Sequence, residues 1–359
     1  MCMLFIIITI IPVSASETSI TISINNIDKI VLDNNIELKM AENSLKSKIQ
    51  YYDDLDDDID SLEKKISDLE NSGEINESNS KLKEEYEQKK NDLKEQYEQK
   101  KNDLKIARIT YQNRVREVVT SAQEKYIKYL YDKSIKEIKE EELKYNKEKN
   151  DIAKRKYDMG YISKNEYSTK IIDIIDIQNE YNKLSVDEDL SLKELKNSLG
   201  IGNKKIVIDE NINFDINNIA NIDFEEDFDY MISNNRNIKI KEIELEQLED
   251  KDESDDYEID NAELELTQEE NNSRLNFQEK YNNLISSYNN IRNSINKLND
   301  KEKAFNIMKV KLDHGYVSNK ESEEKYIELI NQKSEYIKDK NQLYINYLKY
   351  LQMKDGYLS

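Results

Sequence analysis

Helix-breaking residues are almost absent from this chain. Its only proline is Pro12, and it has six glycines in 359 residues. Proline interrupts a helix because it lacks the backbone N–H and clashes with the preceding turn, so the sequence after Pro12 permits very long helices. Hydrophobic residues make up only 37% of the chain and charged residues 36%, which suits narrow apolar seams better than several globular cores. We therefore expect an all-α chain of long antiparallel coiled-coil hairpins.

The charge of the chain excludes one class of partner. Acidic residues outnumber basic ones by 75 to 54, which gives a formal net charge of -21. A surface of this sign repels the phosphate backbone, so we expect no nucleic-acid partner. The only cysteine is Cys2, so the chain cannot form an internal disulfide.

The N-terminus has the pattern of a signal peptide. Residues 4–13 are apolar, and Val13, Ser14 and Ala15 place small residues where a signal peptidase would cut. A segment this short cannot cross the ~30 Å core of a bilayer as a helix. We therefore predict a signal peptide at 1–15, and a mature chain that is exported to the cell envelope or surface with no membrane-spanning segment of its own.

Two short segments repeat each other and indicate an internal duplication. The segments YDMGYISKNEY (157–167) and LDHGYVSNKES (312–322) place Gly160 and Gly315 155 residues apart. Between the two repeats the helical period is lost, and residues 205–209 could form one short strand. The predicted division of the chain after the signal peptide is a first helical repeat with an extended hairpin at 16–200, a linker at 201–223, a second helical repeat at 224–353 and a C-terminal tail at 354–359.

The first repeat is longer than the second for a visible reason. Asn34 and Asn234 are corresponding positions 200 residues apart in the helical patterns at 24–50 and 224–249, so 45 residues are extra in the first repeat when compared with the glycines. An eleven-residue unit occurs twice in succession at 82–103, and this period extends a helix with almost no supercoil. If both arms of a hairpin lengthen together, each gains about 22 residues, and the first hairpin projects about 33 Å beyond the second.

Apolar residues recur at the spacing of a coiled-coil seam in both repeats. We expect these positions to be packed in the core. They are Tyr131, Ile135, Ile138, Tyr145, Ile152, Tyr167, Ile171, Ile174 and Tyr181 in the first repeat, and Tyr281, Leu284, Tyr288, Ile291, Ile295, Leu298, Tyr326, Leu329, Tyr336, Leu343 and Tyr347 in the second.

Each repeated segment has the residues of a tight turn between two helices. Gly160 and Gly315 can adopt the left-handed conformation that ends a helix. Three residues later Ser163 or Ser318 can cap the next helix, and a glutamate three residues beyond completes a capping box. The apolar residues at these turns, which we expect to be exposed, are Tyr161, Ile162, Tyr316 and Val317. They either close the end of the coiled coil or contact a partner.

The longest motifs, at 156–200 and 311–351, each begin with a lysine and a glycine-serine turn and continue as one helix. This ordered, duplicated pattern resembles the TolC-like outer-membrane efflux family. The resemblance implies a homotrimer whose twelve helices form a hollow α-barrel, with the turns at its inner tip. By that resemblance the turns dock a periplasmic-adaptor-like protein, which connects to an inner-membrane pump or ABC exporter. The implied docking residues are Lys156, Gly160, Tyr161, Ile162, Ser163, Lys311, Gly315, Tyr316, Val317 and Ser318.

The chain departs from the family at the opposite end of the repeats. The family has two membrane strands per repeat between the paired helices, whereas this chain has the polar segments 71–80 and 249–256 there, without the alternation that such strands need. We therefore predict a divergent member without membrane strands. The expected function is a non-catalytic efflux or type I secretion duct. The alternative is a cell-surface coiled-coil spacer without a lumen.

Other candidate chemistry is set aside. Asp56, Asp58 and Asp60 alternate as in a calcium loop, but Ser61 stands where that loop needs glycine, so we expect a solvated helix face and no metal site. His314 is the only histidine, and we expect a polar turn residue. The sequence has no phosphate-binding loop or nucleophile motif, and we expect no cofactor and no enzymatic activity.

Overall fold

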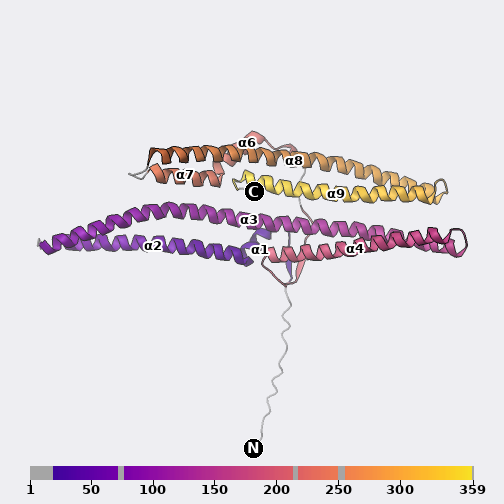
Figure 1. The fold of residues 1–359 in the computed structure, drawn as a ribbon, viewed down its shortest axis with the longest axis horizontal. Coiled ribbons are helices and arrows are strands. Elements are labelled where there is room, and N and C mark those ends of the chain that lie inside the picture. Colours follow the sequence, from indigo (N-terminus) through magenta and orange to yellow (C-terminus); the bar gives the residue numbers. More distant parts are fainter. Residues whose placement is uncertain (1–18, 72–76, 213–216, 250–254, 358–359) are drawn as a thin grey trace, which may run out of the picture.

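The computed structural model describes residues 19–71, 77–212, 217–249 and 255–357, and most of them are helical (Figure 1). The prediction of long antiparallel helices is confirmed. The helices are α1 (Ile27–Asn34), α2 (Ile36–Asn71), α3 (Glu77–Asp158), α4 (Lys164–Ser198), α5 (Asn217–Ala220), α6 (Phe224–Asn234), α7 (Arg236–Glu249), α8 (Asp256–Asp313) and α9 (Asn319–Lys354), and the strands are β1 (Ile20–Ile22) and β2 (Ile206–Ile208). Among the described helices, none combines the length and the apolar character needed to cross a membrane.

The two longest described helices are α3 and α8, and the other long helices pack along them. α3 has 82 residues and α8 has 58, so they extend over roughly 123 Å and 87 Å at 1.5 Å per residue. α2 and α4 pack along α3, α7 and α9 pack along α8, and α3 contacts both α7 and α9. The helices therefore form a layer in the order α8, then α7 with α9, then α3, then α2 with α4 (Figure 1).

Most predicted seam residues are packed between helices. Leu284, Ile291 and Leu343 are buried in one core cluster of the second repeat. Two predictions were wrong, because Ile152 and Ile171 are 42% and 38% exposed. Near the first turn the contact between α3 and α4 is made instead by the stacked rings of Tyr157 and Tyr167, whose centroids are 5.1 Å apart.

The two hairpins differ in length by the amount that the sequence predicted. α2 has 36 residues and its counterpart α7 has 14, a difference of 22. The α2–α3 arm accordingly extends past the end of α7 and α8 on one side of the molecule (Figure 1). Residues 72–76 and 250–254 lie outside the described residues, so most of the segments predicted to lack membrane strands are not placed. The residues on both sides of each gap that the structure describes belong to or directly precede helices.

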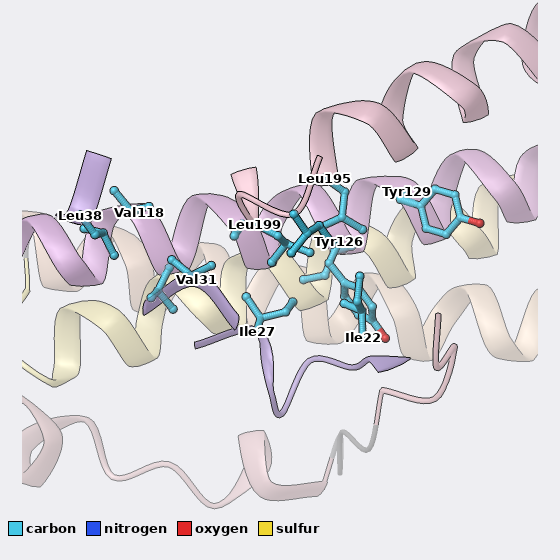
Figure 2. Close-up of a cluster of buried hydrophobic side chains, with 13 residues drawn as sticks. Ile22, Ile27, Val31, Leu38, Val118, Tyr126, Tyr129, Leu195 and Leu199 are labelled. Atoms are coloured by element: carbon cyan, nitrogen blue, oxygen red, sulfur yellow. The ribbon is translucent and has the colours of Figure 1, made fainter. Parts of the chain in front are cut away.

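A small parallel sheet lies at the middle of the molecule. β2 falls within the strand predicted at 205–209, and its partner β1 was not predicted. The hydroxyl of Tyr126, which is fully buried in α3, donates a hydrogen bond to the carbonyl oxygen of Asp209 just after β2. Figure 2 shows Tyr126 between Ile22 of β1 and Leu199 at the end of α4. We call this region, with the two helix junctions described next, the waist.

At the first junction α4 ends where α2 begins. The side-chain Nδ2 of Asn35 donates to the carbonyl oxygen of Ser198 at 2.9 Å, and its Oδ1 accepts from the N–H of Leu38 at 3.1 Å. One amide thus satisfies an open carbonyl of α4 and an open N–H of α2. Gly200 lies so close that an added Cβ would be 2.5 Å from the carbonyl oxygen of Asn34. The negative end of one helix therefore faces the positive end of the next.

At the second junction α9 ends where α7 begins. The N–H of Arg236 donates to the carbonyl oxygen of Gly356 at 3.1 Å, and a Cβ on Gly356 would collide with the backbone of Asn234. Asn235 caps α7 by accepting from the N–H groups of Asn237 and Ile238. The guanidinium of Arg236 lies 3.4 Å from the ring centroid of Tyr357. The C-terminal segment, which the sequence indicated only as a tail, thus completes this junction.

Replacing Gly200 by alanine tests the first junction. At φ +67 the left-handed backbone alone costs about 1–2 kcal/mol for a residue with a Cβ, and the backbone contact with Asn34 adds to it. We expect Gly200→Ala to lower the free energy of unfolding by roughly 3 kcal/mol, measured by urea denaturation.

Gly202→Ala is the matched control. Gly202 also has positive φ, at +53, but a Cβ there meets no atom within 4 Å. We expect it to cost about 1–2 kcal/mol, the backbone part alone. Equal losses in the two variants would contradict a close junction at Gly200.

Candidate functional site

The sequence-predicted docking residues lie at two helix reversals at the same end of the molecule (Figure 1). We call residues 156–167 the first tip and 311–322 the second tip. Gly160 and Gly315 have φ +76 and +73, as predicted for helix-ending glycines. In the first tip the N–H of Tyr161 donates to the carbonyl oxygen of Lys156 at 2.8 Å, and in the second the corresponding distance is 2.9 Å. Lys156 and Lys311 therefore serve the turns through their backbones.

The predicted capping boxes are confirmed at both tips. The Oγ of Ser163 accepts from the N–H of Glu166 at 3.2 Å, and Oε2 of Glu166 accepts from the N–H of Ser163 at 2.7 Å. Ser318 and Glu321 repeat both distances. The hydrogen bond from the serine N–H lowers the pKa of each glutamate. The two tips thus share one backbone scaffold.

The apolar tip residues differ in exposure. Tyr161 and Tyr316 are 76% and 80% exposed, in agreement with the prediction. Ile162 and Val317 were expected to be exposed as well, but that prediction was wrong because both are half-buried. Met159 is also exposed at the first tip, and sequence reasoning did not select it. Its only sequence signal was its position before the glycine.

His314 is a turn residue, as predicted. It caps α8, and its ring centroid lies 6.1 Å from that of Tyr316. Asp56, Asp58 and Asp60 lie on the exposed face of α2, also as expected. In the described part of the chain, no group of three Asp, Glu, His or Cys side chains is arranged to hold a metal ion.

A groove of about 390 Å³ runs between the two tips, and we call it the tip groove. It lies between the end of α3, the start of α4 and the start of α9. Its lining residues are Lys149, Ile152, Ala153, Lys156, Ile162, Glu166, Thr169, Lys170, Asn319, Lys320 and Glu323.

Residues of both repeats form the tip groove. Lys170 of α4 pairs with Glu323 of α9 at 3.0 Å, and behind the groove the rings of Tyr145 and Tyr326 stack with centroids 3.7 Å apart. Of the predicted docking residues, only Lys156 and Ile162 line the groove. Sequence reasoning missed the others because they come together only through contact between segments about 150 residues apart.

The two edge helices of the layer carry exposed apolar side chains. Exposed apolar side chains that gather in one region often mark a surface for another protein. The exposed apolar residues are Ile171, Ile172, Ile175, Val186 and Leu190 on α4, and Tyr257, Leu264, Leu275, Ile307 and Val310 on α8.

Comparisons with known proteins give similarity in structure only. No protein-family model matches the chain, and no curated protein matches its sequence. Among solved structures, the Vibrio cholerae outer membrane protein VceC has a TM-score of 0.64 at 10% identity, covering 94% of this chain and 97% of that one. The Campylobacter jejuni CmeC outer membrane channel has a TM-score of 0.61 at 11% identity, covering 93% and 86%.

A third neighbour, a membrane protein from Pseudomonas aeruginosa, has a TM-score of 0.66 at 8% identity and covers 92% of both chains. These likenesses span nearly the whole molecule. They confirm the TolC-like fold that the repeated motifs indicated.

The lowered pKa of Glu166 and Glu321 predicts a pH dependence of the tips. A carboxylate whose pKa is lower in the folded state stabilises above its unfolded pKa of about 4.5, and the effect is lost as the pH falls through the lower folded value. We expect the amide of Ser163 to lose protection from hydrogen exchange between pH 5 and pH 3.

Glu166→Gln isolates this effect. It removes the titrating group from the first tip, so the Ser163 amide should lose its pH dependence, whereas the Ser318 amide in the intact second tip should keep it. If both amides keep the same pH profile in this variant, the capping carboxylate is not the cause.

Proposed function

We propose that the protein is a non-catalytic duct component of an efflux or secretion system at the cell envelope. Copies join edge to edge into a closed ring, with the tips at one mouth. The support is the TolC-like fold together with two of the neighbours, since CmeC is described as an outer membrane channel and VceC as an outer membrane protein. The description of CmeC as a channel fits a non-catalytic role.

The proposed ring rests on the exposed apolar residues of the two edge helices. The layer ends in α8 on one side and in α4 on the other, so each edge helix can still pair with a helix of another copy. Exposed apolar residues on both edges favour pairing of α4 in one copy with α8 in the next, because each contact removes apolar surface from water. A heterologous contact of this kind closes into a ring, and three copies of a layer four helices wide would give twelve helices.

The tips complete the proposed function. Their glycine turns are rigidly capped and present Tyr161 and Tyr316 to solvent. A capped turn with an exposed aromatic ring suits docking, since little side-chain entropy is lost on contact. We propose that an adaptor of an efflux pump or type I exporter docks at the ten tip residues named above.

A structural spacer is the second candidate. The α2–α3 arm favours it, because its apolar residues Leu55, Ile59, Leu62 and Ile66 are buried within the arm and its other faces are charged. Such an arm extends the molecule without enclosing a passage. Electron cryo-microscopy along the ring axis distinguishes the candidates, since a filled centre leaves only the spacer.

Charges placed on the α4 edge should prevent assembly. Val186→Glu with Leu190→Glu introduces two carboxylates at positions that are 66% and 51% exposed in the single copy. Burying an unpaired charge costs several kcal/mol, so the ring should not form. We expect light scattering to report a trimer for the unchanged protein and a monomer for this variant.

Ile327→Glu is the control. Ile327 is 54% exposed but lies on α9, inside the layer, so its replacement should leave the trimer intact. A protein that is monomeric without any substitution contradicts the proposed ring.

A further inference from the structure

A separate pocket of about 200 Å³ lies at the waist, and we call it the waist pocket. Residues between 127 and 134 of α3 form one wall, residues between 337 and 344 of α9 form another, and the segment 210–212, which follows β2, closes a third side. The hydrogen bond from Tyr126 to the carbonyl oxygen of Asp209 holds this third side against α3. The pocket is therefore built from both repeats and from the segment that links them.

The walls of the waist pocket are mostly apolar and aromatic. Four aliphatic side chains and two tyrosines line it, namely Ile127, Leu130, Ile212, Ile337, Tyr131 and Tyr344. An apolar cavity of about 150 Å³ accommodates a benzene-sized ring. The waist pocket is slightly larger, so it admits one six-membered ring with small substituents.

One polar atom of the pocket lacks a partner. The Oδ1 atom of Asn341 is buried and accepts no hydrogen bond from the residues that the structure describes. By contrast, the hydroxyl of Ser134 already donates to the carbonyl oxygen of Leu130 at 2.8 Å. A buried acceptor without a donor is unfavourable, so a ligand that offers an O–H group gains binding energy at this position.

The two lysines of the pocket differ in their contacts. Lys133 is paired with Glu210 and lies 3.8 Å from Glu137. Lys340 has no carboxylate within 4.0 Å among the described residues, and its Nζ lies 5.7 Å from the ring centroid of Tyr344. One ammonium group in the pocket is therefore not neutralised by direct contact.

Carboxylates nevertheless outnumber lysines around the pocket. Asp209 precedes Glu210, and Asp339 precedes Lys340, so with Glu137 four acidic residues accompany the two lysines. This balance disfavours a free anion as the ligand. The ammonium of Lys340 can still attract the face of an uncharged aromatic ring.

We propose that the waist pocket binds a small uncharged aromatic molecule that carries a hydroxyl group, such as a substituted phenol. The ring lies among the aliphatic side chains and beside Lys340, and its O–H donates to Oδ1 of Asn341. The occupant contacts both repeats, so it stabilises the waist by mass action. This ligand site goes beyond the proposed duct and does not rest on it, because the pocket lies within one copy.

The test is a titration of the purified protein with p-cresol, followed by NMR of labelled isoleucine methyl groups. The methyl resonances of Ile127, Ile212 and Ile337 report on the pocket, and that of Ile59 in the α2–α3 arm reports on nonspecific effects. Of these four, we expect only the three pocket resonances to show saturable shifts, with a dissociation constant of about 1 mM or lower.

Two further probes separate the contributions to binding. The ligand p-fluorotoluene has nearly the same shape as p-cresol but no O–H group, so it should bind about five-fold more weakly. The ligand p-hydroxybenzoate keeps the hydroxyl and adds a negative charge, so it should also bind more weakly than p-cresol.

Asn341→Leu removes the acceptor at a similar side-chain size. It should weaken binding of p-cresol about five-fold and leave p-fluorotoluene unchanged. Asn331→Leu is the matched control, because Asn331 lies at an exposed position of α9 outside the pocket, and it should change neither affinity.

Four outcomes overturn the inference: no saturable shift at the pocket methyl groups, a shift of the same size at Ile59, binding of either further probe as tightly as p-cresol, or unchanged p-cresol affinity in Asn341→Leu. A monomeric protein that binds p-cresol as expected would contradict the proposed ring and leave the waist pocket intact.

Discussion

End-to-end contact between helices at the waist is the interaction on which the rest of this structure depends. α3 and α8 are continuous, but the helices packed beside them are interrupted at the waist, where α4 meets α2 and α9 meets α7. Each meeting point would leave open carbonyls on one side and open N–H groups on the other. Asn35 satisfies both at the first junction, and Asn235 with the backbone of Arg236 does so at the second. These contacts fix the positions of α2 and α4 along α3, and of α7 and α9 along α8.

Glycine at these junctions follows from distance as well as from backbone conformation. Gly160 and Gly200 have similar positive φ values, yet of these two only Gly200 has a neighbouring backbone within 4 Å of the place where a Cβ would lie. The tip glycine is needed for the turn alone, and the waist glycine is needed for the turn and for the approach of another helix. The sequence shows the same residue in both places. The structure separates the two physical reasons.

Local patterns predicted local features well. Spacing and capping residues predicted the tips, because a glycine and a serine three residues later act within one turn. Counting residues predicted the longer α2–α3 arm, since helix length is proportional to residue number. The breaks before Ile36 and Arg236, strand β1 and the tip groove were not predicted. Each depends on a contact between distant segments, such as Ile20 with Ile206, and helical periodicity carries no information about such contacts.

The tip groove illustrates why a duplication yields one site and not two. Both tips have the same caps and the same backbone hydrogen bonds, so their geometry is repeated. Ile162 of the first tip faces into the groove, and the wall opposite is formed by Asn319 and Lys320 just after the second tip. Because no third repeat among the described residues packs against the outer side of the second tip, an equivalent groove there would need another copy. Ring closure would therefore create a second class of groove, with different side chains, between neighbouring copies.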